Sequence, residues 1–131
     1  HRLIRRQRQM CIRDRYNYAA ELNVAGQYEE SLRICKASSV RMSDYYTRLL
    51  QADNCKQLKR YKEAERHLQQ ASYMCPNRFT PLYELYTIYE AQGDTASMHR
   101  TAEAILRKPI KVDSPEVRQI IAKMKRFKQI N

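Results

Sequence analysis

The chain has 131 residues, a formal net charge of +11, and only two glycines and four prolines. So few helix-breaking residues predict a mostly helical chain of the size of one domain. No apolar run approaches the roughly 20 residues of a membrane span, and no signal-peptide pattern precedes the first expected helix. Because the chain starts at His1 rather than Met, we expect it to be a piece of a longer protein.

The positive charge is concentrated at the two ends. Residues 1–15 carry six arginines against Asp14, residues 107–131 carry eight basic against two acidic residues, and residues 16–106 are balanced. A nucleic-acid-binding repeat is expected to carry a basic stripe along its binding face, so nucleic acid is a disfavoured partner. The arginines of the N-terminal arm are Arg2, Arg5, Arg6 and Arg8. Two interpretations of this arm remain open: attraction to an anionic membrane surface, at about 1 kcal/mol per basic residue, or a solvated helix face.

Hydrophobic periodicity and turn residues predict the helices in chain order. They are expected near residues 3–24, 27–41, 44–57, 61–74, 79–91, 94–107 and 115–129. Ser114 followed by Pro115 and Glu116 is typical of a helix start, with a serine cap and an acid near the positive end of the helix. The last helix then carries an apolar stripe that we expect to cover the preceding hairpin, as the terminal helix of a repeat protein must.

One turn-centred pattern occurs three times at the spacing of helical hairpins. The segments Gly26-Gln27-Tyr28, Lys59-Arg60-Tyr61 and Gly93-Asp94-Thr95 lie 33 and 34 residues apart. A repeat of that length indicates stacked helix-turn-helix units, because one unit cannot bury its own apolar face. Both glycines of the chain fall at the same place, where a left-handed backbone between two helices suits a residue without Cβ.

The middle unit resembles a tetratricopeptide repeat. Ala52, Tyr61, Ala64, Ala71 and Pro76 match the small, aromatic and closing positions of that family. The other two units depart from the pattern, chiefly at Ser31, Ser38, Thr95 and Met98. The resemblance implies an all-α, right-handed superhelix of three hairpins at about 12–43, 44–78 and 79–112. A basic arm or helix extension (1–11) would precede the hairpins, and a capping helix (114–131) would follow them.

The same resemblance implies a concave groove, lined by the first helix of each hairpin, that binds a protein or peptide. The residues placed in this groove are Arg13, Tyr16, Asn23, Tyr46, Leu49, Asp53, Lys56, Tyr83, Thr87 and Glu90. Tyrosines and mixed charges suit a large amphipathic contact, although the tyrosines could equally serve only to pack neighbouring helices. The clamp with which some family members hold acidic C-termini is missing, because its positions are Tyr16, Ala20, Leu50, Thr80 and Glu84.

The stretches Leu58–Asp94 and Ala104–Ile120 are similar to the C-terminal repeat region of bacterial O-antigen ligase/polymerase-like membrane proteins. The resemblance depends on the Pro76-Asn77-Arg78-Phe79 corner, on Lys108-Pro109 and on the Ser114-Pro115 start. It implies a parent in the bacterial inner membrane that assembles cell-surface polysaccharide, with its catalytic region outside this chain. The membrane side stays open; the basic arm and cysteines that are expected to be free thiols favour the cytoplasmic side. The first alternative is a stand-alone peptide-binding adaptor. The second, less favoured alternative is a nucleic-acid-binding helical repeat.

Catalytic motifs are missing from the sequence: it contains no phosphate loop, no nucleophile elbow and no paired metal-ligand spacing. We therefore expect no catalytic residue, no metal and no cofactor, and we interpret His67 and His99 as ordinary helix-surface residues. The four cysteines have no Cys-x-x-Cys spacing, and Cys35 and Cys55 fall at apolar helix positions, which predicts buried free thiols. Two disulfides are the alternative, in an oxidising compartment. A homo-oligomer, in which a second copy of the chain is the partner, is a further alternative.

Overall fold

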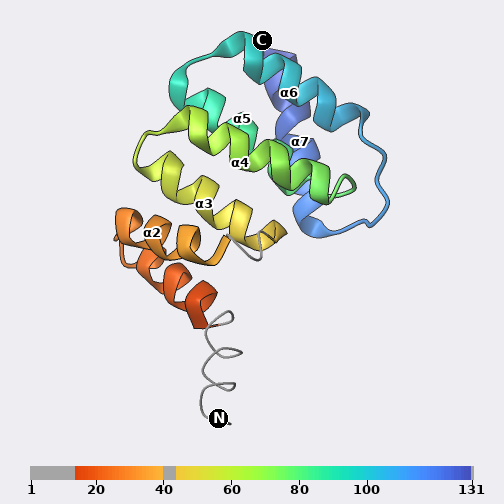
Figure 1. Cartoon of the computed structure of the whole chain (residues 1–131). Coiled ribbons are helices and arrows are strands. Elements are labelled where there is room, and N and C mark those ends of the chain that lie inside the picture. Colours follow the sequence, from red (N-terminus) through yellow and green to blue (C-terminus); the bar gives the residue numbers. More distant parts are fainter. Residues whose placement is uncertain (1–13, 40–43, 131) are drawn as a thin grey trace, which may run out of the picture. The chain divides into compact units, whose positions relative to one another are not determined.

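The computed structural model describes residues 14–39 and 44–130, which form helices joined by short turns and contain no strand (Figure 1). The first described helix comprises residues 14–24. The helices that follow are α2 (Tyr28–Ser39), α3 (Tyr45–Gln57), α4 (Tyr61–Met74), α5 (Thr80–Gln92), α6 (Thr95–Arg107) and α7 (Pro115–Ile130). The all-α prediction is confirmed, and the predicted helix limits that fall on described residues agree to within one residue. The predicted helix end at residue 41 lies outside the described residues. The arm residues Arg2, Arg5, Arg6 and Arg8, and the predicted groove residue Arg13, lie outside the described residues.

The chain divides into two compact units, residues 1–67 and residues 68–131, and the boundary falls inside α4. This boundary does not coincide with any limit of the predicted hairpins, and the division into three repeats stays a prediction. The first unit holds helix 14–24, α2, α3 and the first half of α4. The second holds the rest of α4 with α5, α6 and α7.

Small side chains let the helices of the first unit approach closely. Ala19, Cys35, Ala52, Cys55 and Ala64 are all buried. Ser31, which departs from the alanine expected there, is also fully buried. Its hydroxyl donates to the backbone carbonyl of Ala19 at 2.6 Å, so a side chain of α2 bonds the backbone of helix 14–24.

The three repeated turns share one backbone conformation. Gly26, Lys59 and Gly93 have φ angles of 83°, 62° and 72°, in the left-handed region. In each turn this residue donates its N–H three residues back, and the next residue donates five residues back, for example Gln27 N to the Leu22 carbonyl at 2.8 Å. This pair of bonds is the Schellman motif, which satisfies the last carbonyls of a helix. The predicted glycine positions are confirmed, and Lys59 takes the same conformation without being a glycine.

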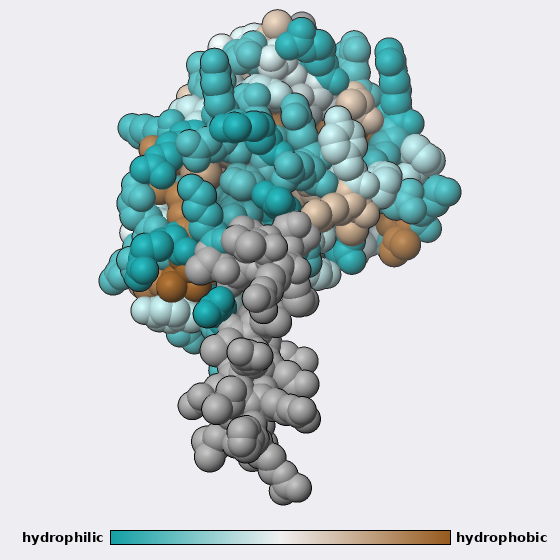
Figure 2. All heavy atoms as spheres, in the orientation of Figure 1, coloured by the Kyte–Doolittle hydropathy of each residue, from teal (hydrophilic) through white to brown (hydrophobic). Residues whose placement is uncertain are grey.

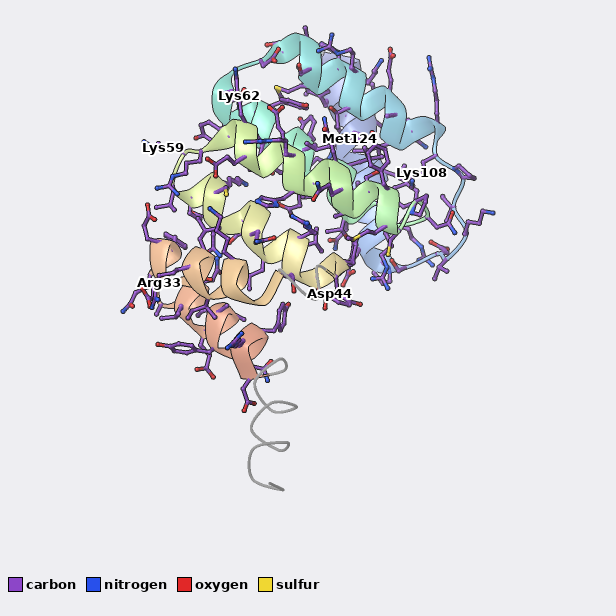
Figure 3. The ribbon with its side chains drawn as sticks, viewed as in Figure 1. Arg33, Asp44, Lys59, Lys62, Lys108 and Met124 are labelled. Atoms are coloured by element: carbon purple, nitrogen blue, oxygen red, sulfur yellow. The ribbon has the colours of Figure 1, made fainter. Side chains whose placement is uncertain are left out.

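The second unit is organised around α5, α6 and α7. Its core contains Phe79, Tyr86, Ala102, Ile105 and Met124. Met124, which lies on α7 (Figure 3), is fully buried, as the predicted apolar stripe of the last helix requires. The predicted cap is present as well: the hydroxyl of Ser114 accepts a hydrogen bond from the backbone N–H of Val117 at 3.2 Å.

Three cysteines are described, and all three are free thiols. Cys35 and Cys55 are buried, and burial raises the pKa of each thiol to about 11. The alternative of two disulfides requires all four cysteines to be paired, so it does not occur in this structure.

The outer surface is polar where it is seen. On the face drawn in Figure 2, the described residues are mostly hydrophilic and apolar residues form only small, separate areas. A binding site on this face therefore combines polar and apolar groups, as the mixed character of the predicted groove residues also indicates.

Candidate functional site

The predicted groove residues are distributed over both units, and the structure brings two of them into contact in the first unit. The side-chain amide of Asn23 donates to Asp53 Oδ2 at 2.8 Å and to Asn54 Oδ1 at 2.8 Å. Asn23 lies near the end of helix 14–24 and Asp53 lies in α3, so this contact joins two first helices of the predicted hairpins. Tyr46 is 50% exposed, and its ring meets that of Tyr45 edge-on at 5.3 Å between centroids.

The two faces of α3 carry different groups. Successive residues of a helix are about 100° apart, so Tyr46, Leu49, Asp53 and Lys56 share one face. Arg48 and Gln51 lie on the opposite face, with the buried Cys55 between them. The predicted groove residues of α3 therefore face away from the side chains that α3 directs between α2 and α4.

In the second unit, Tyr83, Thr87 and Glu90 follow one another along α5. Thr87 donates its hydroxyl hydrogen to the carbonyl of Glu84 at 2.7 Å, within the helix. Tyr83 instead faces α7: the Lys123 ammonium donates to Tyr83 Oη at 3.0 Å and lies 5.3 Å from the centroid of the Tyr83 ring. The bond to Tyr83 is the largest cause that raises the pKa of Lys123.

Tyr83 and α7 line an open cavity of about 410 Å³, which we name the Tyr83 cavity. Its lining consists of Tyr83, Glu116, Gln119, Ile120, Lys123 and Arg126. Sequence reasoning missed the α7 residues because it assigned this helix only to covering the core. The spacing of Gln119, Lys123 and Arg126 by four and three residues, on one side of the predicted helix, is the signal that could have found them.

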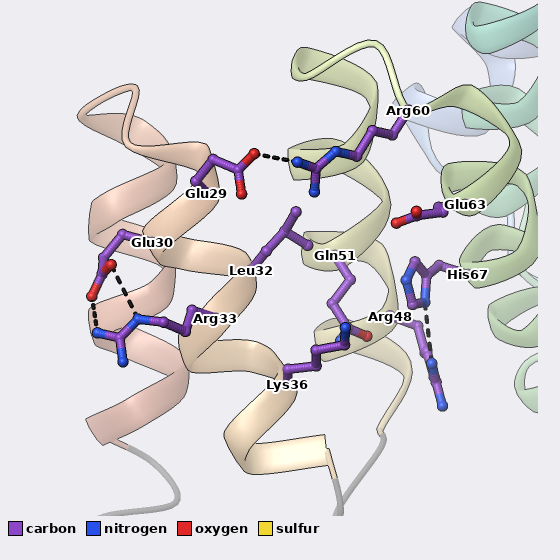
Figure 4. A pocket seen from close by; sticks show the side chains of 10 residues that line it. All are labelled: Glu29, Glu30, Leu32, Arg33, Lys36, Arg48, Gln51, Arg60, Glu63 and His67. Carbon is purple, nitrogen blue, oxygen red and sulfur yellow. Dashed lines mark hydrogen bonds and ion pairs between the residues drawn. The ribbon is translucent and has the colours of Figure 1, made fainter.

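A second cavity, of about 510 Å³, lies on the other face of α3 in the first unit (Figure 4). We name it the Gln51 cavity. Its lining consists of Glu29, Glu30, Leu32, Arg33, Lys36, Arg48, Gln51, Arg60, Glu63 and His67. Glu29 pairs with Arg60, and Glu30 pairs with Arg33. None of these residues was predicted as a site residue, since the resemblance to tetratricopeptide repeats directs attention to the opposite face.

The two histidines predicted at the helix surface are both partly buried. His67 lines the Gln51 cavity, with Arg48 Nη1 at 3.1 Å from its Nδ1. Burial lowers the pKa of His67, and the nearby charge of Arg48 lowers it further. The ring of His99 lies tilted against the ring of Phe127 on α7, with 4.7 Å between their centroids.

The described residues provide neither a metal-binding cluster nor a membrane-spanning helix. In the described ranges, no group of three His, Cys, Asp or Glu residues is placed to hold a metal ion. Of the helices that the structure describes, none combines the length and the apolar character of a membrane span. The expectations of no catalysis, no metal and no cofactor stay predictions.

Comparison with known proteins identifies the fold. No family model matches the chain, and no curated protein matches it. Among solved structures, the chain is similar to PcrH, in the crystal structure of PcrH in complex with the chaperone binding region of PopB. The TM-score is 0.71 and the sequence identity 14%, over 87% of this chain and 91% of that chain. At this identity the likeness shows the fold alone, which is an all-helical repeat fold of the tetratricopeptide type.

Proposed function

We propose that the chain is a non-catalytic protein-interaction module that binds a segment of a partner polypeptide on the first helices of its hairpins. The observation that carries this proposal is the fold it shares with PcrH, a protein that was solved with a bound region of PopB. Helical repeats commonly present the faces of successive helices as extended binding surfaces. The part of α3 that carries Tyr46 and Asp53, and the Tyr83 cavity, supply such surfaces in the two units.

The chemistry of these surfaces favours an amphipathic segment. The Tyr83 cavity combines the Tyr83 ring and Ile120 with the ammonium group of Lys123 and with Arg126, which suits an apolar side chain followed by an acidic one. The Asn23–Asp53 pair offers polar groups that can hydrogen-bond a peptide backbone. Acidic C-terminal peptides of the kind held by a carboxylate clamp should not bind, because none of the clamp positions carries Lys, Asn or Arg.

A displayed library of random peptides, panned against the full chain, supplies the probes for a test. The recovered peptides are titrated against the wild type, Tyr83→Ala and Lys123→Ala by fluorescence anisotropy. We expect at least about tenfold weaker binding, or 1.4 kcal/mol, for both variants. The matched controls are Tyr73→Ala, at a side chain that is 80% exposed on α4, and Lys125→Ala, which points away from the Tyr83 cavity on α7. Equal losses in the controls, or the recovery of no binding peptide, would contradict the proposal.

Self-association is the competing use of the same surfaces. A second copy of the chain could occupy them, and sedimentation equilibrium over a range of concentrations distinguishes the two cases. We expect the wild type to stay monomeric at the concentrations that bind peptide. A dimer that Lys123→Ala dissociates would assign the surface to a second copy.

A second proposal concerns the parent protein. The Pro76–Phe79 corner and Lys108, both part of the resemblance to O-antigen ligase-like proteins, meet in the second unit. Lys108 donates to the Pro76 carbonyl, and its ammonium lies 6.0 Å from the centroid of the Phe79 ring. We propose on this resemblance that the chain is the repeat region of such a membrane protein. The full-length reading frame tests this: several predicted spans before His1 would support it, and a frame without them leaves the stand-alone adaptor.

The proposed membrane location has its own test. The full chain is sedimented with anionic and with neutral liposomes, beside a variant in which Arg2, Arg5, Arg6 and Arg8 are replaced by Gln. Binding only to anionic liposomes, lost in the variant and at high salt, is the expected result. Equal sedimentation with both liposome types would remove the membrane argument from the basic arm.

A further inference from the structure

The Gln51 cavity lies on the face of α3 opposite to the predicted groove, so the proposed function does not use it. At about 510 Å³ it falls inside the range of roughly 300–1,000 Å³ typical of ligand sites. Figure 4 shows Gln51 in its middle, between the Glu29–Arg60 pair at one end and the Arg48–His67 contact at the other. All of its lining residues belong to the first unit.

Two buried polar atoms of this cavity have no hydrogen-bond partner among the residues that the structure describes. They are Gln51 Oε1 and Arg48 Nε. Gln51 is only 3% exposed, so its carboxamide is withdrawn from bulk water. A buried acceptor and a buried donor left without partners destabilise the folded protein, and native proteins rarely retain such atoms without a reason. A bound group that supplies both partners is such a reason.

The two atoms together specify what that group must offer. Arg48 and Gln51 are three residues apart on α3, so their side chains are neighbours on one helix face. Nε–H needs an acceptor, and Oε1 needs a donor. A peptide group presents both, with its carbonyl for Arg48 and its N–H for Gln51. An inorganic anion would satisfy only Arg48, and it would meet the carboxylates of Glu29, Glu30 and Glu63.

We propose that the Gln51 cavity binds a short segment of a partner polypeptide through a backbone peptide group held between Arg48 and Gln51. The rim suits such a segment because it carries both signs of charge: Glu29 pairs with Arg60, and Glu30 with Arg33, all at exposed positions. Exposed ion pairs are weak, so charged side chains of the segment can exchange with them at little cost. The chain then has two polypeptide-binding faces on either side of α3.

The experiment separates this face from the proposed groove. Peptides recovered from the random displayed library on the wild-type chain are titrated against Gln51→Leu, Arg48→Lys and Lys123→Ala. We expect one class of peptides to lose at least about tenfold in affinity with Gln51→Leu and with Arg48→Lys while keeping wild-type affinity for Lys123→Ala. Peptides of the groove should show the reverse pattern, so either proposal can fail without the other.

A melting curve for each variant excludes a general loss of structure. Because Gln51 Oε1 has no described partner in the free protein, Gln51→Leu should melt at or above the wild-type temperature although it loses binding. Arg48→Lys keeps the charge and removes the Nε donor, so retained binding in this variant would mean that charge alone is recognised. The proposal is overturned by that result, by peptides that bind Gln51→Leu as well as wild type, or by full displacement of the peptides by inorganic phosphate at constant ionic strength.

Discussion

The side-chain amide of Asn54 donates to the hydroxyl of Ser31 at 2.8 Å, and both residues are fully buried. The Ser31 hydroxyl donates onward to the carbonyl of Ala19, and Asn54 Oδ1 accepts from Asn23. One hydrogen-bonded chain thus connects helix 14–24, α2 and α3. Buried polar groups that are fully satisfied in this way help to specify one arrangement of the helices.

The first prediction concerns this network. Ser31→Ala restores the small residue usual in tetratricopeptide repeats, yet it leaves the buried Asn54 amide hydrogen without its acceptor and removes the hydroxyl that donates to the Ala19 carbonyl. We expect it to lower the free energy of unfolding by about 1–3 kcal/mol, measured by urea denaturation. Ser72→Ala, a partly buried serine on α4, is the control and should change stability by less than roughly 0.5 kcal/mol.

A double-mutant cycle identifies the bond itself. Asn54→Leu should cost less in the Ser31→Ala background than in the wild type, with a coupling energy of roughly 0.5–3 kcal/mol. Additive losses would show that the two residues act on stability independently of their hydrogen bond.

The second prediction concerns the turn between α3 and α4, where Lys59 (Figure 3) has a φ of 62°. The left-handed conformation costs a residue with Cβ about 1–2 kcal/mol. Glycine avoids this cost, but it loses roughly 0.5–1 kcal/mol because it gives up more backbone entropy on folding. We therefore expect Lys59→Gly to raise the free energy of unfolding by roughly 0.5–1 kcal/mol.

Gly93→Ala supplies the opposite change. A Cβ at Gly93 would meet no atom within 4 Å, so its cost is only the left-handed backbone. By the same balance of backbone conformation and entropy, we expect a loss of roughly 0.5–1 kcal/mol in the same denaturation experiment. A stabilising Gly93→Ala, or a destabilising Lys59→Gly, would refute this account of the turns.

The third prediction concerns the last helix. Met124 is fully buried in the core of the second unit, so Met124→Ala should cost about 2–5 kcal/mol of unfolding free energy. Deletion of residues 114–131 should expose the apolar sides of Tyr86 and Ile105 and lead to aggregation. Light scattering and thermal melting check both variants. A truncated chain that stays monomeric with the wild-type melting temperature would show that α7 is not needed as a cap.

The fourth prediction concerns pH. Burial and the Arg48 charge lower the pKa of His67 in the folded state, so the unfolded chain takes up this proton first as the pH falls. The contribution of neutral His67 to the free energy of unfolding is therefore fully present above the unfolded pKa of about 6.5. This contribution is lost as the pH falls below that value. The difference in unfolding free energy between the wild type and His67→Gln, measured from pH 8 to pH 5, should shrink or change sign towards acid. A difference that is constant over this range would contradict the effect.

The helices were predictable because their signals are local. The Schellman turns at Gly26 and Gly93, the Ser114 cap and the apolar stripe of α7 each depend on residues a few positions apart, and the structure confirms them. The Lys59 turn was predicted from its position in the repeat. The buried thiols of Cys35 and Cys55 follow from the same helical periodicity.

The site was less predictable because it depends on side chains from different helices. Lys123 was assigned to no site, and only the packing of α7 on α6 and α5 places its ammonium beside Tyr83. His67 was assigned to the surface, and only the approach of α3 to α4 buries it beside Arg48. No local pattern encodes these distances.

The sequence by itself determined that this chain is a set of helical hairpins, because the period of its apolar residues and the placing of its turns depend on short stretches of backbone. Only the tertiary structure decided what the polar exceptions do. Ser31 completes a buried network because Asn54 of α3 packs against it, whereas Gln51 of α3 lines a cavity in which its Oε1 has no hydrogen-bond partner among the described residues. Asn54 and Gln51 are three residues apart on the same helix, α3. Their different roles arise because hydrogen bonding is directional and short-ranged, so it depends on which neighbouring helix each side chain meets.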